Sequence, residues 1–417
     1  MRVLASCTAG LLVVSLLLGV APAALADHGD EKRALIASRA QASSQSARFA
    51  TFTTGLTRPG AGELVQELSG SDNARARVSA EILQTVRPDV VLLGGFDNEP
   101  GSAAVELFYQ NYLRVGQNGK DPLDYPYVYS PSSNAGVPSG FDLDNDAGID
   151  GPGDALGPGA FRGQDAMVLF SRYPIQTDAV RTFRNFLWKD MPGARHDSAT
   201  TQDGDWYSAD ELAVLPLSST SHWDVPVVVA GRTVHVLASH PGAPVAGGSA
   251  IQRARTGDEI RFWSDYVRGA SYGYDDDGAP GGLKQGERFV VLGDQNIDPL
   301  DGGAAATSIN QLLDSSLVQD PLPSSEGAVE AAALQGGANA THRADPRFDT
   351  VDLEDQGAGN LRADYVLPSR TLRVSSSGVF WPRAGLPGSE LTGILPFPAS
   401  EHRLVYADVV PRDARPR

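Results

Sequence analysis

The stretch RPDVVLLGGFDNEPG, residues 87–101, is the part of this sequence that says most about the fold. Its apolar run, residues 90–93, is short, rich in β-branched side chains and followed by glycines, which predicts a buried strand. That strand ends in Gly-Gly-Phe-Asp, residues 94–97, at a position where α/β proteins often carry functional side chains. The two glycines either make room for a substrate or stand where a functional side chain is missing.

The segments around this stretch predict an alternation of strands and helices. A strand is expected at 47–56, and an amphipathic helix at 73–87 because its apolar residues recur at helical spacing and Pro88 ends it. Further strands are predicted within these segments: 165–175, 225–240, 288–296, 363–369 and 402–411. Two further helices are predicted in 256–267 and 308–318. This order is typical of an α/β protein with a mixed sheet covered by helices.

The ends of the chain and its composition indicate where the protein acts. Residues 1–26 have the basic start, apolar run and small-residue cleavage site of a secretory signal peptide, which predicts a secreted protein with no membrane segment after cleavage. Residues 27–46 form a polar leader, and 47–413 are expected to form a single domain with long loop insertions, as a monomer. The net charge of −17 argues against a general nucleic-acid cradle, which needs a clustered positive surface.

The end of the strand predicted near residue 290 offers oxygen ligands. The sequence Gly-Asp-Gln-Asn places Asp294 and Asn296 two residues apart, on one face if the strand geometry persists. A carboxylate and a carboxamide oxygen together suit a hard cation such as Mg²⁺ or Ca²⁺. The alternative is an ordinary capped turn, which uses the same residue types.

Other predicted strands also begin or end at ionisable side chains. His240 ends one strand, Asp364 begins another, and Glu401 and His402 precede the last one. A carboxylate beside a histidine can fix the imidazole tautomer and support its charged form. Taken singly, each of these residues has a structural or surface interpretation.

Taken together, these strand ends resemble the endonuclease/exonuclease/phosphatase family over nearly the whole mature chain. The resemblance implies a four-layered α/β sandwich, with two mixed β-sheets packed face to face and helices outside. It also implies a metal-dependent phosphoesterase that acts on nucleic acid, DNA or RNA, or on a small phosphate ester. Mg²⁺ is the expected ion, with Mn²⁺ and Ca²⁺ as alternatives.

The resemblance also implies roles for individual residues. Asp294 and Asn296 match the pair that positions the attacking water, His240 and His402 match the two histidines, and Asp364 matches the family's Asp-Tyr-Val-Leu acid. The full expected catalytic set is His240, Asp294, Asn296, Asp364, Glu401 and His402. The expected metal ligands are Asp97, Asp294, Asn296 and Glu401, and the expected substrate contacts are Arg172 and His222.

Three positions depart from the family pattern. Gly95 stands where the family has its metal-binding Glu, and Thr53 stands where it has an Asn. Glu401 replaces the Asp that is expected to orient His402. Asp97 and Glu99 are the nearest acids that could replace the missing carboxylate. The sequence therefore favours an enzyme, and it leaves open a catalytically impaired relative that acts as a binding protein.

One more acidic segment lies outside this set. Asp142, Asp144 and Asp146 alternate in FDLDNDAGID, residues 141–150, as in the ligand-rich half of a calcium loop. The segment has Ala147 where an EF-hand loop has glycine. The two interpretations are a structural calcium site and a solvated Asp-rich turn.

Overall fold

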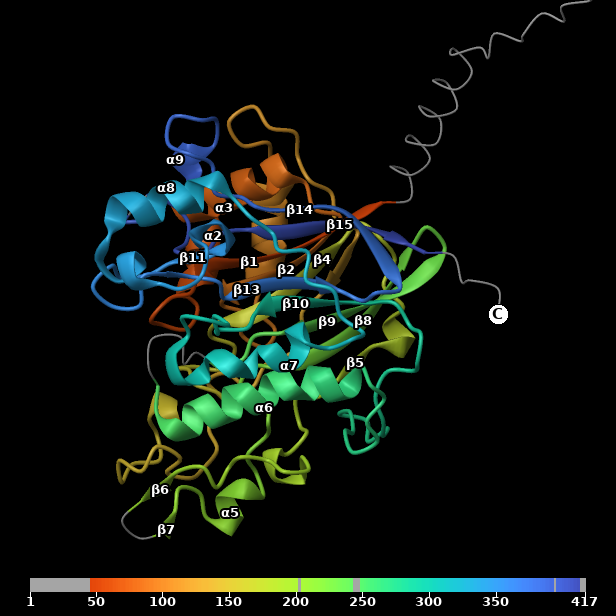
Figure 1. The fold of residues 1–417 in the computed structure, drawn as a ribbon, viewed down its shortest axis with the longest axis vertical. Helices are drawn as coiled ribbons and strands as arrows, with labels where there is room; N and C mark the ends of the chain where they lie inside the picture. Colours follow the sequence, from red (N-terminus) through yellow and green to blue (C-terminus); the bar gives the residue numbers. More distant parts are fainter. Residues whose placement is uncertain (1–45, 202–203, 243–247, 394, 413–417) are drawn as a thin grey trace, which may run out of the picture. The chain divides into compact units, whose positions relative to one another are not determined.

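The computed structural model describes residues 46–412 except 202–203, 243–247 and 394 (Figure 1). The predicted signal peptide, and the predicted leader up to residue 45, therefore fall outside the described residues. All described residues belong to one compact unit. Among them, no helix is both long enough and apolar enough to cross a membrane.

The first sheet contains the strand predicted from residues 90–93. Its strands, in spatial order, are β14 (Leu372–Val379), β15 (Val405–Pro411), β1 (Ala47–Leu56), β2 (Val90–Phe96), β4 (Ala166–Ser171) and β3 (Tyr127–Tyr129). β1 and β2 are parallel, and all other neighbours in this sheet are antiparallel. The sheet is therefore mixed, as expected.

The second sheet carries the Gly-Asp-Gln-Asn sequence. Its strands, in spatial order, are β13 (Asp364–Pro368), β10 (Phe289–Asp294), β9 (Arg232–Ser239), β8 (His222–Val229) and β5 (Arg181–Thr182). β9 and β10 are parallel, so their carboxyl ends lie at the same edge of the sheet. The other neighbouring strands are antiparallel.

Helices and short elements complete the described part of the chain. The α-helices are α2 (Glu63–Leu68), α3 (Ala74–Val86), α4 (Ala104–Phe108), α5 (Ala209–Leu212), α6 (Ala250–Tyr266), α7 (Asn310–Leu313), α8 (Glu326–Gln335) and α9 (Ser389–Thr392), and a π-helical turn at Tyr109–Leu113 continues α4. The two-residue strands are β6 (Thr200–Thr201), β7 (Gly204–Asp205), β11 (Val351–Asp352) and β12 (Asn360–Leu361). Short 3₁₀ turns lie at Pro152–Asp154, Thr177–Ala179, Trp188–Asp190, Gly303–Ser308, Gly337–Thr341 and Pro346–Phe348.

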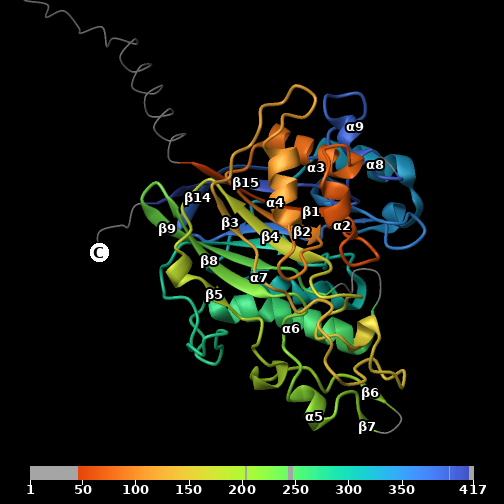
Figure 2. The same ribbon diagram turned by 180° about the vertical axis from the view of Figure 1, so that it is seen from behind.

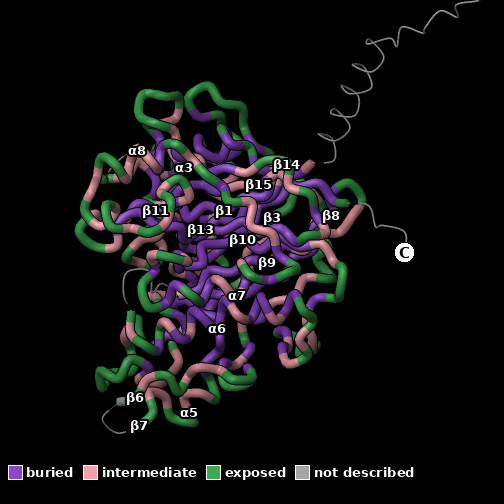
Figure 3. The backbone as a smooth tube through the Cα atoms, viewed as in Figure 1, coloured by how far each residue is buried: buried purple, intermediate pink, exposed green. Residues whose placement is uncertain are grey.

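Alternating side chains on each strand divide the core into layers. In β1, Phe49 packs in the cluster between the two sheets, whereas Phe52 packs in the cluster beneath the helices of the first sheet. In β10, Val290 faces the first sheet and Val291 faces α6. Successive side chains of a strand point to opposite faces, so each strand contributes to two apolar layers. The two sheets form the most deeply buried part of the described residues (Figure 3).

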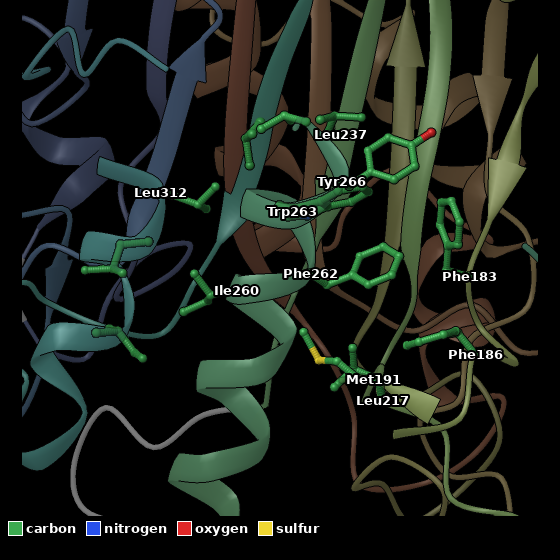
Figure 4. Close-up of a cluster of buried hydrophobic side chains, with 14 of the residues drawn as sticks. Phe183, Phe186, Met191, Leu217, Leu237, Ile260, Phe262, Trp263, Tyr266 and Leu312 are labelled. Atoms are coloured by element: carbon green, nitrogen blue, oxygen red, sulfur yellow. The ribbon is translucent and has the colours of Figure 1, made fainter. Parts of the chain in front are cut away.

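The outer layers are helical. α2, α3 and α4 cover the first sheet (Figure 2). α3 begins at Asn73, whose side chain accepts a hydrogen bond from the N–H of Ala76, which is the usual N-cap contact. α6 covers the second sheet, where Phe262 and Trp263 pack against Phe183 in an aromatic cluster (Figure 4). Two sheets between two helical layers confirm the predicted four-layered sandwich.

Most predicted elements are present, and the differences have physical reasons. α3 occupies 74–86, as the apolar spacing predicts. The helix predicted in 308–318 is reduced to a 3₁₀ turn followed by the four-residue α7. The Ser-rich β14 and helix α8 were not predicted. β14 lies at a sheet edge, where four central residues are exposed or half-buried and the apolar alternation is weak.

Candidate active site

The centre of the site is Asp294, the last residue of β10. The residue is 4% exposed, and its Oδ1 accepts the backbone N–H of Asn296 at 2.8 Å. The side-chain amide of Asn296 in turn donates to the carbonyl of Pro241 at 3.0 Å, which ties the end of β10 to the end of β9. Gly293 permits this approach, because a Cβ there would lie 1.9 Å from the carbonyl oxygen of Ser239.

Two histidines flank the Asp294 carboxylate. The Nε2 of His240, which follows β9, lies 3.5 Å from Asp294 Oδ2, and the Nε2 of His402 lies 3.7 Å from the same oxygen. The Nδ1 of His402 is 2.9 Å from Asp364 Oδ2, which also accepts a hydrogen bond from the Thr350 hydroxyl. The structure thus brings five predicted residues together: His240, Asp294, Asn296, Asp364 and His402.

The carboxylates keep both imidazoles in the charged form. Burial lowers the pKa of His240, but the negative charges of Asp165 and Asp294 outweigh it and raise the pKa to about 9. Burial also lowers the pKa of His402. The negative charges of Asp364 and Asp294 outweigh this effect and raise the pKa of His402 to about 9. Burial raises the pKa of Asp294, but both histidines more than offset this and hold it below its ordinary value. At neutral pH the site therefore contains an Asp294 carboxylate between two imidazolium rings.

The two glycines at the end of β2 adopt an irregular conformation. The pairing of β2 with both neighbours shifts register around Gly94 and Gly95, and Gly95 has φ +60°. A Cβ on Gly95 would lie 3.0 Å from the backbone N of Gly55 and 3.0 Å from Thr53 Cγ2, so it would face β1. A Cβ on Gly94 would lie 3.4 Å from His240 Nδ1. The glycines allow β1, β2 and His240 to lie close together.

The acids nearest to Gly95 are engaged in backbone contacts. Asp97 is buried, and its two oxygens accept the backbone N–H groups of Arg58 at 2.7 Å and Asp165 at 3.1 Å. Burial raises its pKa to about 6, and these hydrogen bonds oppose the rise. Glu99 accepts the N–H of Gly62 at 2.6 Å. The structure does not place Asp97, an expected metal ligand, among the residues that line the central cavity.

One expected role of Glu401 and the expected roles of Arg172 and His222 do not match the contacts of these residues. Glu401 lines the cavity, but the carboxylate hydrogen-bonded to His402 is Asp364, so the expectation that Glu401 orients His402 is not met. Arg172 pairs with Asp89 at 2.9 Å, at the opposite end of β2 from the glycines. His222 is buried within hydrogen-bonding distance of Ser218 and the Glu259 carbonyl, and burial lowers its pKa to about 4.

The site opens into a cavity of about 670 Å³ between the strand ends. Its described lining residues are Thr53, Gly55, Thr57, Arg58, Arg75, Gly95, Asp165, His240, Asp294, Asn296, Leu395, Pro396, Phe397, Ser400, Glu401 and His402. A second cavity, of about 280 Å³, shares Asp165, His240 and Asn296 with it. Asp165 and Arg75 were not expected here, because neither lies in a motif that distinguishes it from a surface charge.

The Asp-rich segment forms a compact turn away from this cavity. Asp142, Asp144 and Asp146 each offer a carboxylate oxygen within 4.8 Å of the others. The oxygens of Asp142 accept backbone N–H groups from Asp146 at 3.0 Å and Ala147 at 2.9 Å. These contacts fit both a turn and half of a cation loop, so a calcium ion here stays a prediction.

Comparison with known proteins gives the class of protein that this fold and site define. The family model described as Endonuclease/Exonuclease/phosphatase family matches residues 66–402. The chain belongs to this family, whose members are metal-dependent phosphoesterases.

Similar solved structures come from several organisms. An endonuclease/exonuclease/phosphatase from Beutenbergia cavernae DSM 12333 is 16% identical, with a TM-score of 0.47, covering 88% of this chain and 72% of that one. TDP2 from D. rerio, solved with a single-strand DNA product, is 11% identical, with a TM-score of 0.40 and coverages of 87% and 98%. Beta toxin 275-280 from Staphylococcus aureus is 14% identical, with a TM-score of 0.42 and coverages of 87% and 99%. No curated protein matches the sequence.

Proposed function

We propose that this protein hydrolyses phosphate esters in the 670 Å³ cavity. The observation that carries the proposal is the buried Asp294 carboxylate, which lies between the rings of His240 and His402 at the cavity wall. Burying charged groups costs free energy, and a buried ion pair often adds no net stability. The fold therefore has no structural need for two charged histidines around one buried acid. Such an arrangement is typical of a site that handles protons and an anionic substrate.

We assign a role to each of these groups. Asp294, held by Asn296, is placed to orient a water molecule and to accept its proton as the water attacks phosphorus. His240 and His402 can donate hydrogen bonds to the phosphoryl oxygens, whose negative charge increases in the transition state. Asp364 holds the His402 ring in position through a hydrogen bond with His402 Nδ1. An imidazolium is also able to protonate the leaving oxygen.

The residues present fit a divalent cation. Asp294 and Asp364 have carboxylate oxygens within 4.8 Å of each other, and Asp364 Oδ1 is buried without a hydrogen-bond partner. Asp294, Asn296 and Glu401, which all line the cavity, would hold the ion, and we propose Mg²⁺, with Mn²⁺ and Ca²⁺ as alternatives. A bound cation would neutralise charge on the phosphoryl oxygens and lower the pKa of a bound water.

The substrate is proposed by class. The cavity can accept a phosphodiester or a phosphomonoester, from DNA, RNA or a small molecule. The net charge of −17 opposes long-range attraction of a polyanion, and this favours small or short substrates.

A substrate panel tests this function. Purified protein would be assayed with Mg²⁺, Mn²⁺ and Ca²⁺ on plasmid DNA, RNA, bis-p-nitrophenyl phosphate and p-nitrophenyl phosphate. We expect metal-dependent hydrolysis that falls about 100-fold or more in His402→Ala, because one donor to the phosphoryl oxygens is lost. His342→Ala, a half-buried histidine outside the cavity lining, is the matched control and should retain activity.

A second candidate function is phosphate-ester binding without hydrolysis. Gly95 and Thr53 favour it, because they remove two of the family's expected side chains from the cavity. In that case ³¹P NMR would show phosphate binding that His402→Ala weakens, while no substrate in the panel would be turned over.

Secretion and the monomeric state are also proposals. Residues 1–26 lie outside the described residues, so secretion is supported by their sequence pattern alone. Expression of the full chain followed by N-terminal sequencing of protein from the medium tests it, with Asp27 as the expected first residue. Light scattering tests the monomer.

A further inference from the structure

The end of β2 lacks the metal-binding acid expected of the family, and the two acids that follow this strand, Asp97 and Glu99, do not line the cavity beside Asp294. A side chain on Gly95 would point at β1, and Asp97 has both oxygens bound to backbone N–H groups. Glu99 accepts the N–H of Gly62 through Oε1, and its Oε2 is buried without a partner but away from the residues that line the cavity. We propose that Asp165, at the start of β4, supplies the missing carboxylate and helps to hold the divalent cation; this rests on the proposed function.

The strand register places Asp165 beside the glycines. β2 and β4 are antiparallel neighbours, and Phe96 pairs with Ala166 across the irregular stretch. Asp165 therefore lies next to the end of β2, at the edge of the first sheet where Gly95 lies. It lines both the larger and the smaller cavity, together with His240 and Asn296. Its carboxylate is thus in the same cavity as Asp294.

The Asp165 carboxylate is available for a ligand. Among the described residues, no hydrogen-bond donor contacts its oxygens, and no Lys, Arg or His nitrogen lies within 4 Å of them. Asp97 differs, because both of its oxygens are occupied. The field of Asp165 nevertheless reaches the site, since it contributes to the raised pKa of His240. A half-buried carboxylate whose oxygens accept no hydrogen bond suits a cation.

The backbone of Asp165 is held in an unusual conformation. Its φ is +52°, a region that non-glycine residues adopt infrequently, although Asp and Asn tolerate it better than most. Its N–H donates to Asp97 Oδ1 at 3.1 Å, while Asp97 Oδ2 accepts the N–H of Arg58. Asp97 is therefore a positioning residue: it fixes the β4 start against the loop after β1. The acid expected to bind the metal instead orients another acid.

Manganese binding tests the proposal without relying on turnover. Mn²⁺ affinity would be measured by electron paramagnetic resonance in the full chain carrying Asp144→Asn and Asp146→Asn, which removes binding by the Asp-rich turn. In that background, Asp165→Asn should weaken Mn²⁺ binding about tenfold or more, and Asp165→Glu should weaken it less. Asp178→Asn, an exposed acid in a 3₁₀ turn, is the matched control and should leave the affinity unchanged.

The outcomes separate this proposal from the proposed function. Both Asn and Gly adopt a positive φ readily, so Asp165→Asn and Asp165→Gly are expected to fold, and their melting temperatures check this. Unchanged Mn²⁺ affinity in Asp165→Asn and Asp165→Gly overturns the role of Asp165. An equal loss of Mn²⁺ affinity in Asp178→Asn also overturns it. Absence of Mn²⁺ binding in the parent protein also overturns it. Hydrolysis that persists in EDTA would then show that the proposed function survives without the metal.

Discussion

At the scale of single residues, the two glycines after β2 answer the question that their sequence raises. Gly95 is not simply a vacant ligand position in an otherwise unchanged strand. Its positive φ, its closeness to Gly55 and the register shifts beside it show that the backbone departs from regular strand geometry here. A substitution that restores the family's Glu would therefore start that side chain against Gly55 and Thr53 of β1.

Replacement of Gly95 tests this geometry. Gly95→Ala should lower the free energy of unfolding by about 1–3 kcal/mol, from the positive φ and from contact with β1. Gly101→Ala is the control, because Gly101 has φ +78° with no atom within 4 Å of the Cβ position. Chemical denaturation should show a larger loss for Gly95→Ala. Equal losses would contradict the account, as would a gain in Mn²⁺ affinity in Gly95→Glu.

Asp349 gives the protein a pH dependence that is separate from the site. Burial, together with the charges of Asp298 and Asp301, raises its pKa to about 9. The folded protein thus binds a proton that the unfolded chain releases above about pH 4, and stability falls as the pH rises from there toward 9. Asp349→Asn removes this loss. The difference in stability between the variant and the parent should therefore favour the variant more at pH 8 than at pH 5.

Urea unfolding at the two pH values measures this difference. Asp314→Asn serves as the control, because Asp314 is exposed at the end of α7. The expected result is a smaller drop in midpoint between pH 5 and pH 8 for Asp349→Asn only. If the parent and Asp349→Asn lose the same stability over this range, Asp349 is ionised in the folded protein.

At the scale of elements, α3 contributes a cation to the cavity. Arg75, in its first turn, lines the cavity, donates a long hydrogen bond of 3.4 Å to the Gly55 carbonyl, and has no carboxylate within 4 Å among the described residues. Arg58, by comparison, is paired with Glu67. Arg75 is therefore free to contact an anionic substrate.

Two arginines of the same helix allow a matched test. Arg75→Ala should raise KM for a phosphodiester about three- to tenfold, because one charged hydrogen bond is lost. Arg77→Ala should change KM little, since Arg77 is exposed and contacts Gln117. Steady-state kinetics at low ionic strength compares them. An equal effect of the two substitutions would remove Arg75 from the binding surface.

The burial of each strand decided whether the sequence could predict it. Apolar strands such as β9 and β10 were predicted because both of their faces are buried. β14 was missed because its central residues are polar and partly exposed. The pairing of His402 with Asp364 joins residues 38 positions apart, and local adjacency favoured Glu401 instead.

At the scale of the whole molecule, the site forms where the edges of two sheets meet. The first sheet brings Gly95 and Asp165, and the second brings Asp294 and the His240 that follows β9. The strand ends and the family resemblance predicted the residues of the second sheet. Asp165 could not be predicted, because its position depends on the register of β4 and on the contact with Asp97.

Hydrolysis of bis-p-nitrophenyl phosphate by the full chain and by Asp294→Asn tests the central claim most directly. We expect Mn²⁺-dependent turnover that EDTA abolishes and that falls about a thousandfold in Asp294→Asn, because the buried base is lost. Asp314→Asn should match the parent. Turnover that survives Asp294→Asn, or no turnover with any divalent metal, would contradict the claim.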